Sequence, residues 1–305
     1  MRTTGYIAAL AAAVLFTASC YHENHELALL ENGTGLVGTS LQWEMPDDAG
    51  TSIHALSIAI GGTATPFSRS YKDAKESSGE LIPVAAGKND LLATVNMTPA
   101  DGFTLSGMPA AKADAGVGDV LVSLANPVSS PAQAWFAVIG ADVKDKEIII
   151  VEPKLQRLLS TLSVNLANVP AGTKVVFKLS NVAKSVNLTA KDANGRFGLP
   201  SAESVGELEI ARLTASADGP LSLEGFTLLP TASAFARCIL TIDIVSAAGL
   251  PLTCVCDAPH TESGKGYTLN LDFKTFKPYM FLDSYTISPW EDGWTVNGEV
   301  LNPNE

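Results

Sequence analysis

One cysteine near the N-terminus, Cys20, is the residue of this chain best placed for a defined chemical modification. It follows an uncharged apolar run over residues 6–16 and three small residues at 17–19, and Arg2 precedes the run. This order is typical of a secretory signal, and a cysteine directly after the small residues is an acceptor for acyl chains. We therefore predict export and lipidation at Cys20. An ordinary signal peptide that contains Cys20 stays open, because Thr17 stands where a larger aliphatic residue is usual.

The other three cysteines, Cys238, Cys254 and Cys256, lie late in the chain. Two of them are two residues apart, so on a strand their side chains point to one face, and Cys238 is expected on the preceding strand. A cross-strand disulfide can form in an exported protein. Burial of three small apolar thiols is an equal alternative.

The histidines do not predict a metal or catalytic site. His22, His25, His54 and His260 are scattered, without the His-Glu-x-x-His spacing and without a nearby nucleophile. His22 and His25 belong to the polar segment after Cys20, where a tether is the simpler interpretation. We expect no metal, no cofactor and no catalytic residues.

Four further segments match fragments of binding or catalytic motifs but lack their context. Residues 33–38 have the spacing of a dinucleotide fingerprint, yet no strand precedes them, so their glycines are interpreted as a linker. Residues 192–195 match the start of a calcium loop whose later ligands are missing, and a hairpin turn is predicted. The paired acids at 47–48 and 291–292 are typical of solvated turns. The chain is therefore not expected to be an enzyme.

The composition limits the classes of binding partner that the chain can have. Twenty Lys and Arg against 32 Asp and Glu give a net charge of −12 in 305 residues. No segment gathers the basic residues into a stripe that could neutralise phosphates, so nucleic acid is excluded. The length is that of about two ordinary domains.

Short β-type runs separated by turn residues fill the chain from residue 36 onward. The expected strands are 41–45, 55–60, 90–97, 120–124, 134–139, 148–151, 155–166, 175–179, 186–189, 208–213, 239–245 and 267–273. Spacings of about 8–12 residues are typical of all-β sandwiches or barrels. We predict a signal peptide at 1–19, a lipidated tether at 20–35, an N-terminal β-sandwich domain at 36–150 and a C-terminal β-sandwich domain at 151–305.

Several short motifs follow one another in a recognisable order. After Cys20 come Leu41-Gln42-Trp43-Glu44, a turn and strand over 82–96, Leu228-Leu229-Pro230, the strand at 264–271 and the closing segment 287–293. In this order the chain resembles the fimbrillin-like lipoproteins of Bacteroides-type bacteria, the type V pilin group, and above all their fimbrial anchor subunits. The resemblance implies an all-β protein of two tandem transthyretin-like Greek-key β-sandwich domains. It also implies an outer-membrane lipoprotein on the cell surface, with other fimbrial subunits as partners.

The resemblance further implies assembly by strand exchange, in which a segment of one subunit fills a groove in the next. In this family a stalk pilin loses its N-terminal strand when a trypsin-like protease cuts after a basic residue. No Lys or Arg occurs between Tyr21 and Ser68, so the first such site is Arg69. We therefore expect an anchor subunit that keeps its N-terminus and its lipid.

The segment expected to be donated to another subunit lies at residues 294–301. Trp294, Val296, Gly298 and Val300 share one face of a strand there. An ordinary terminal strand packed on its own domain explains the same alternation and stays open.

Two functions from other classes stay open. A surface glycan-binding lipoprotein would use Trp43, Trp135, Trp290 or Trp294 as a platform for sugars, and a hydrolase would use dispersed carboxylates. A host or bacterial surface ligand bound through the assembled fimbrium is a further expected partner.

Overall fold

The computed structural model describes residues 30–39, 56–61, 67–72, 76, 80–108, 118–152, 154–276, 279–280 and 284–289. The prediction of an all-β sandwich fold is confirmed, because these residues form strands joined by loops, with two short 3-10 turns. The strands of the N-terminal half are β1 (Thr34–Thr39), β2 (Leu56–Gly61), β3 (Phe67–Tyr71), β4 (Leu81–Ala85), β5 (Gly87–Val95), β6 (Phe103–Ser106), β7 (Leu121–Leu124), β8 (Trp135–Val143), β9 (Ile148–Val151) and β10 (Gln156–Arg157).

The C-terminal half contains the remaining strands. They are β11 (Ser160–Val169), β12 (Lys174–Ser180), β13 (Val186–Lys191), β14 (Phe197–Pro200), β15 (Leu208–Thr214), β16 (Gly219–Leu228), β17 (Cys238–Val245), β18 (Pro251–Ala258), β19 (Lys265–Asp272), β20 (Tyr279–Met280) and β21 (Ser284–Pro289). The 3-10 turns are η1 (Pro99–Asp101) and η2 (Phe273–Thr275). Within the described ranges, no helix combines the length and apolar character needed to span a membrane.

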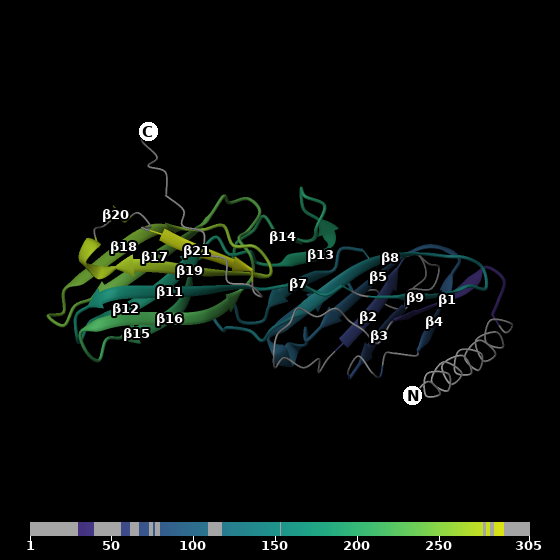
Figure 1. Cartoon of the computed structure of the whole chain (residues 1–305), viewed down its shortest axis with the longest axis horizontal. Helices are drawn as coiled ribbons and strands as arrows, with labels where there is room; N and C mark the ends of the chain where they lie inside the picture. The colour runs from purple at the N-terminus through teal and green to yellow at the C-terminus, as the bar shows by residue number, and fades with distance from the viewer. Residues whose placement is uncertain are drawn as a thin grey trace, which may run out of the picture.

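Two sheets pack against each other in each half (Figure 1). In the N-terminal half these are sheet 1, with strand order β4-β1-β9, and sheet 2, with order β10-β8-β5-β2-β3. Val37 and Ile82 of sheet 1 share a buried core with Ile58, Leu91 and Trp135 of sheet 2. In the C-terminal half, sheet 3 has the order β16-β11-β19-β21 and sheet 4 the order β15-β12-β17-β18-β20.

The two halves repeat one pattern of strand pairing. The first strand of each half lies between an antiparallel and a parallel neighbour, β4 and β9 for β1, and β16 and β19 for β11. The second strand of each half is antiparallel to two others, β3 and β5 for β2, and β15 and β17 for β12. The described strands of the two halves therefore follow the same pairing pattern.

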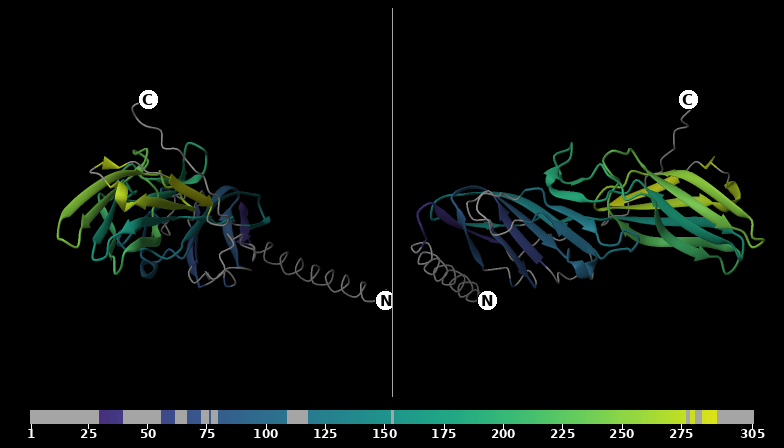
Figure 2. Two further views of the ribbon diagram at one scale, coloured as in Figure 1. Left: turned by 60° about the vertical axis from the view of Figure 1, so that its left-hand side comes forward. Right: turned by 180° about the vertical axis from the view of Figure 1, so that it is seen from behind.

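A fifth sheet, the bridging sheet, joins the two halves. Its order is β14-β13-β7-β6, and β7 pairs with β13 through Val122 and Val186. The N-terminal half contributes β6 and β7, and the C-terminal half contributes β13 and β14. Figure 2 shows these strands in the middle of an elongated molecule. Phe103 and Leu188 of this sheet are buried in one core with Phe136 of sheet 2. The predicted division into domains at 150/151 stays a prediction.

Sheet 2 is covered on both faces, by sheet 1 on one and by the bridging sheet on the other. This explains the run of apolar residues in its strands. Leu91 of β5 is buried in the core shared with sheet 1, whereas its neighbour Leu92 belongs to the core shared with the bridging sheet. A strand buried on both faces has no polar alternation. In β11, by contrast, buried and less buried residues alternate as in a strand with one exposed face.

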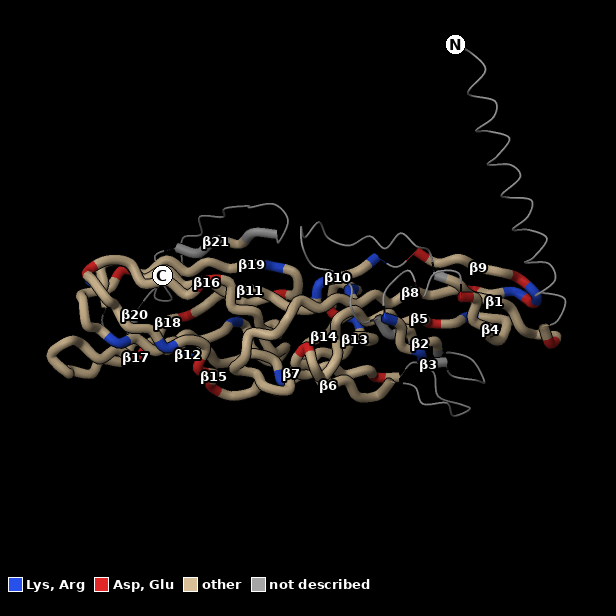
Figure 3. Tube along the Cα trace, turned by 90° about the horizontal axis from the view of Figure 1, so that it is seen from below, with Lys and Arg blue, Asp and Glu red and all other residues tan. Residues whose placement is uncertain are grey.

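The structure divides one predicted strand and adds others. The expected strand at 155–166 is split into β10 and β11, which belong to different sheets. Strands β1, β3, β4, β6, β14, β16, β20 and β21 were not predicted as such, whereas β18 is the strand expected through Cys254 and Cys256. Lys and Arg lie scattered among Asp and Glu along the described chain (Figure 3).

Candidate functional site

The first strand, β1, is the middle strand of sheet 1. Its residues pair with β4 from Thr34↔Ala85 to Gly38↔Leu81, and with β9 from Leu36↔Ile148 to Thr39↔Val151. Leu36 and Val37 are buried. Because β1 has a partner on each side, its backbone groups are used in two ladders.

The start of β1 is fixed to the turn between β8 and β9. The Leu36 N–H donates to the Glu147 carbonyl at 2.8 Å, and the Lys146 N–H donates to the Thr34 carbonyl at 2.8 Å. The Gly33 N–H donates to Asp145 Oδ1 at 2.7 Å. These bonds place the segment before β1 against the body of the N-terminal half.

Gly35 lies inside β1 and is not part of a flexible linker as the sequence interpretation had it. It is buried, and a Cβ atom there would come within 2.5 Å of Val143 Cγ1 and 2.7 Å of the Lys144 carbonyl oxygen. Only glycine allows β1 to pass this close to the end of β8. The glycine spacing that matched a dinucleotide fingerprint therefore has a packing cause.

Loss of β1 would create a site for another strand. It would free one edge of β4 and one edge of β9, and uncover Ile82, Val84 and Val151, which are buried in the same core as Val37. Unpaired backbone groups beside an apolar groove are the features that β-strand addition requires. Sheet 1 is therefore the candidate site for strand exchange.

Arg69, the first Lys or Arg after Arg2, lies in β3 opposite Ile58 of β2. Its guanidinium forms an ion pair with Glu80 and lies 5.7 Å from the centroid of the Tyr71 ring. Burial, and then the nearby negative charge of Glu80, raise the pKa of the Tyr71 hydroxyl. A cut after Arg69 would separate both β1 and β2 from the body, and β2 carries Ile58 and Ile60 into the core.

The other predicted site residues lie outside the described residues. These are Cys20 and the donor segment with Trp294, Val296 and Val300, together with His22, His25, His54, Trp43 and Trp290. The last strand that the structure describes before the donor segment is β21, which pairs with β19 from Asn270↔Ser284 to Lys265↔Pro289.

The three described cysteines are free thiols in the core of the C-terminal half. Cys238 pairs across the ladder with Ala258, whereas Cys256 pairs with Leu240 and Cys254 with Ile242. This register puts no cysteine directly opposite another, so the alternative of buried apolar thiols holds. Burial raises the pKa of all three, that of Cys256 to about 12.

The remaining candidates are also placed. Residues 192–195 form the turn between β13 and β14, as predicted, with Gly195 at φ 79°. His260 is exposed in the β18–β19 loop. Trp135 is fully buried in β8, so it is not a platform for sugars. In the part of the chain that the structure describes, no cluster of three His, Cys, Asp or Glu is arranged to hold a metal ion.

Known proteins match this chain in structure, whereas the sequence comparisons found no match. No family model and no curated protein matches the chain. The fimbrial anchor protein Mfa2 from Porphyromonas gingivalis superimposes with a TM-score of 0.52 at 12% identity, over 87% of this chain and 100% of that one. A candidate adhesin from Bacteroides thetaiotaomicron covers 88% of this chain and 100% of its own length, at 11% identity and a TM-score of 0.49. The chain thus has the fold of the fimbrial anchor protein Mfa2, which confirms the predicted fimbrillin-like resemblance at the level of the fold.

Proposed function

We propose that this chain is a structural lipoprotein subunit of a cell-surface fimbrium, and that it is the subunit that anchors the fimbrium to the outer membrane. The observation that carries the proposal is the position of β1. It is the central strand of sheet 1, and no Lys or Arg separates it from β2 or from the predicted lipid site at Cys20.

A subunit with these properties keeps its first strand. Protease cleavage after Arg69 would remove two ladders of sheet 2 as well as the centre of sheet 1, because β2 pairs with both β3 and β5. Such a loss would remove part of the core and not just open a groove. The groove in sheet 1 therefore stays closed, and the subunit joins a fimbrium as a donor of a strand.

Attachment to the membrane is assigned to the lipid on Cys20. One acyl chain binds a bilayer only marginally, whereas several chains hold a protein there stably. The segment between Cys20 and β1 is then the tether. We propose no enzymatic activity for the protein. The C-terminal segment with Trp294, Val296 and Val300 is the donated strand.

The test uses cells that assemble fimbriae and a tagged copy of this chain. Fimbrial subunits should co-purify with the unchanged protein. Deletion of residues 294–305 should leave a folded, membrane-bound protein from which fimbrial subunits are lost. Cys20→Ala should do the reverse, leaving binding to fimbrial subunits intact and releasing the protein from the membrane. Unchanged co-purification after the deletion would refute the donor role.

A further inference from the structure

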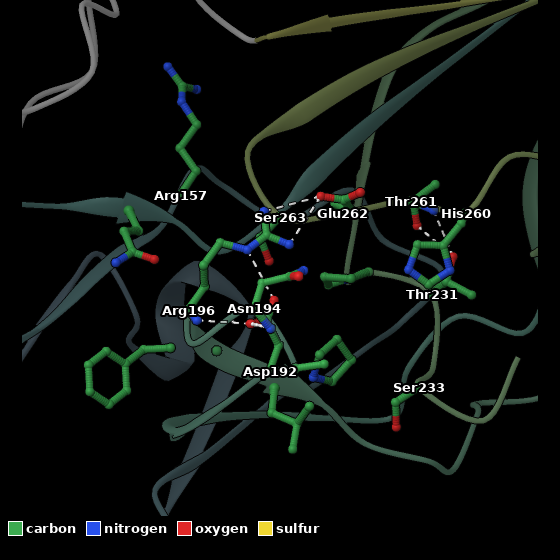
Figure 4. A pocket seen from close by; sticks show the side chains of 17 residues that line it. Arg157, Asp192, Asn194, Arg196, Thr231, Ser233, His260, Thr261, Glu262 and Ser263 are labelled. Atoms are coloured by element: carbon green, nitrogen blue, oxygen red, sulfur yellow. Dashed lines mark hydrogen bonds and ion pairs between the residues drawn. The ribbon is translucent and has the colours of Figure 1, made fainter. Parts of the chain in front are cut away.

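A pocket of about 510 Å³ lies where the β13–β14 hairpin of the bridging sheet meets loops of the C-terminal half (Figure 4). Its walls come from β10, the hairpin, the β16–β17 loop and the β18–β19 loop. The volume falls within the range of about 300–1,000 Å³ that is usual for small-molecule sites. The strand exchange proposed above does not involve this pocket.

The hairpin side of the pocket is held by a chain of polar contacts. Asp192 Oδ1 accepts hydrogen bonds from the backbone N–H groups of Asn194 and Arg196, each at 2.8 Å, and Asp192 Oδ2 accepts one from Arg196 Nε at 3.0 Å. Arg196 Nη1 reaches Glu262 Oε2 at 3.3 Å. The hairpin tip is thereby tied to the β18–β19 loop, and the wall is organised before any ligand enters.

The opposite wall is fixed by a second set of bonds. The Thr261 N–H donates to Thr231 Oγ1 at 2.8 Å, and both threonines are buried. Ser263 Oγ donates to the Leu158 carbonyl at 2.9 Å. These contacts join the two loops to each other and to the segment before β11.

Three charged side chains of the lining, Asp192, Arg196 and Glu262, are paired with one another. Arg196 lies between Asp192 and Glu262, and Glu262 also pairs with Lys265 Nζ at 3.1 Å. In Figure 4 the side chain of Arg157 runs away from this group. An ionic ligand would have to break these pairs, so the pocket favours a neutral one.

Several polar side chains of the lining have unused hydrogen-bonding capacity. Asn194, Ser233, His260 and Gln156 line the pocket, and none of these side chains bonds to another described residue. Amides, hydroxyls and neutral imidazoles can both donate and accept hydrogen bonds. Sugar hydroxyl groups also do both, so a polyhydroxylated ligand is complementary to a lining of this kind.

Apolar groups complete the lining. Phe197, Leu199, Pro200 and Pro230 contribute carbon surface. A sugar ring presents C–H groups on its faces and hydroxyls at its rim, which matches apolar side chains together with polar ones. From this combination we propose that the pocket binds a neutral carbohydrate, a short segment of a glycan chain.

The test is binding of the full chain, purified in detergent, to an array of neutral, sialylated and sulfated oligosaccharides, with calorimetry on the neutral probe that binds best. Asn194→Ala and His260→Ala should each weaken binding about five- to tenfold, the effect of one lost hydrogen bond of ordinary strength. Asn165→Ala is the matched control, since Asn165 lies on the outer face of β11 and bonds only to Asn270 in the same sheet. It should leave affinity unchanged.

Thermal unfolding of the same variants checks that the pocket variants remain folded. The side chains of Asn194 and His260 make no bond to other described residues, so their midpoints should match that of the unchanged protein. Absence of binding to any neutral oligosaccharide would overturn the proposal. Binding that is confined to charged glycans, or that survives both substitutions, would overturn it as well. The measurement needs no fimbrium, so its failure leaves the anchoring proposal standing.

Discussion

Gly198 of β14 lies against the ring of Phe136 in β8, so close that a Cβ atom at position 198 would come within 2.7 Å of Phe136 Cζ. Gly198 also has a φ of 95°, in the left-handed region. Phe136 is buried in the core that sheet 2 shares with the bridging sheet. This contact seats the β13–β14 hairpin, and with it one wall of the pocket, on the N-terminal half.

Gly198→Ala should therefore destabilise the protein more than an ordinary glycine substitution at positive φ. The unfavourable φ costs about 1 kcal/mol, and the forced displacement of Phe136 adds about 1–3 kcal/mol. Gly206→Ala is the control, because Gly206 has a φ of 83° but an added Cβ there would have no atom within 4 Å. Denaturant unfolding compares the two, and equal losses would contradict the contact. Adding Phe136→Leu to Gly198→Ala should restore part of the loss.

Gly35→Ala should destabilise the protein by about 1–3 kcal/mol, because the added methyl group meets Val143 and the Lys144 carbonyl. Gly140→Ala in β8 is the control, since its Cβ would have only an ordinary contact at 3.9 Å, with Asp90 Oδ1. Denaturant midpoints measure both. If β1 were a dispensable tether, the two variants would have the same stability as the unchanged protein.

The sequence pattern predicts strands well where one face is buried. In β12 and β17 buried residues alternate with less buried ones, and both strands lie where the pattern placed them. The same reasoning missed β1, because the two glycines at 33 and 35 look like a linker until their neighbours are known. The bridging sheet depends on pairing between Val122 and Val186, which no local pattern encodes.

The pocket also escapes sequence reasoning for a physical reason. It is assembled from four segments that are distant in the chain, and Arg196 and Glu262 meet only because the hairpin folds back. The turn at 192–195 was the one local signal, and it predicted the hairpin without the pocket beside it. Cys20 and residues 294–301 stay predictions, since they lie outside the described residues.

The thiols of Cys238, Cys254 and Cys256 should resist alkylation in the folded protein. Burial raises their pKa values, that of Cys256 to about 12, so little thiolate is present at pH 8. In the chain carrying Cys20→Ala, iodoacetamide should add nothing under native conditions and should label all three cysteines in guanidinium chloride, as measured by intact mass. Labelling of only one cysteine after unfolding without reductant would reveal a disulfide.

The link between the hairpin and the β18–β19 loop should weaken in acid. Hydrogen bonds from the backbone N–H of Arg196, its side chain and the backbone N–H of Asn194 lower the pKa of Asp192. Burial raises the pKa of Glu262, but Lys265 and Arg196 outweigh it, and the net shift is downward.

Carboxyl groups with lowered pKa values stabilise the fold above their unfolded pKa of about 4, and this contribution is lost as the pH falls through the folded value. Between pH 6 and pH 3 the unchanged protein should lose more stability than the double variant Asp192→Asn/Glu262→Gln. Urea midpoints at several pH values give both profiles. Parallel profiles would mean that these two carboxylates do not contribute to the acid sensitivity.

Retention of the first strand by the membrane-bound protein is the central claim, and the N-terminus of that protein tests it most directly. The protein is extracted from cells that assemble fimbriae and analysed by intact mass and N-terminal peptide mapping. We expect an acylated N-terminus at Cys20, with β1 still attached to the chain. A cell-associated protein that begins at Ser70, after cleavage at Arg69, would contradict the claim.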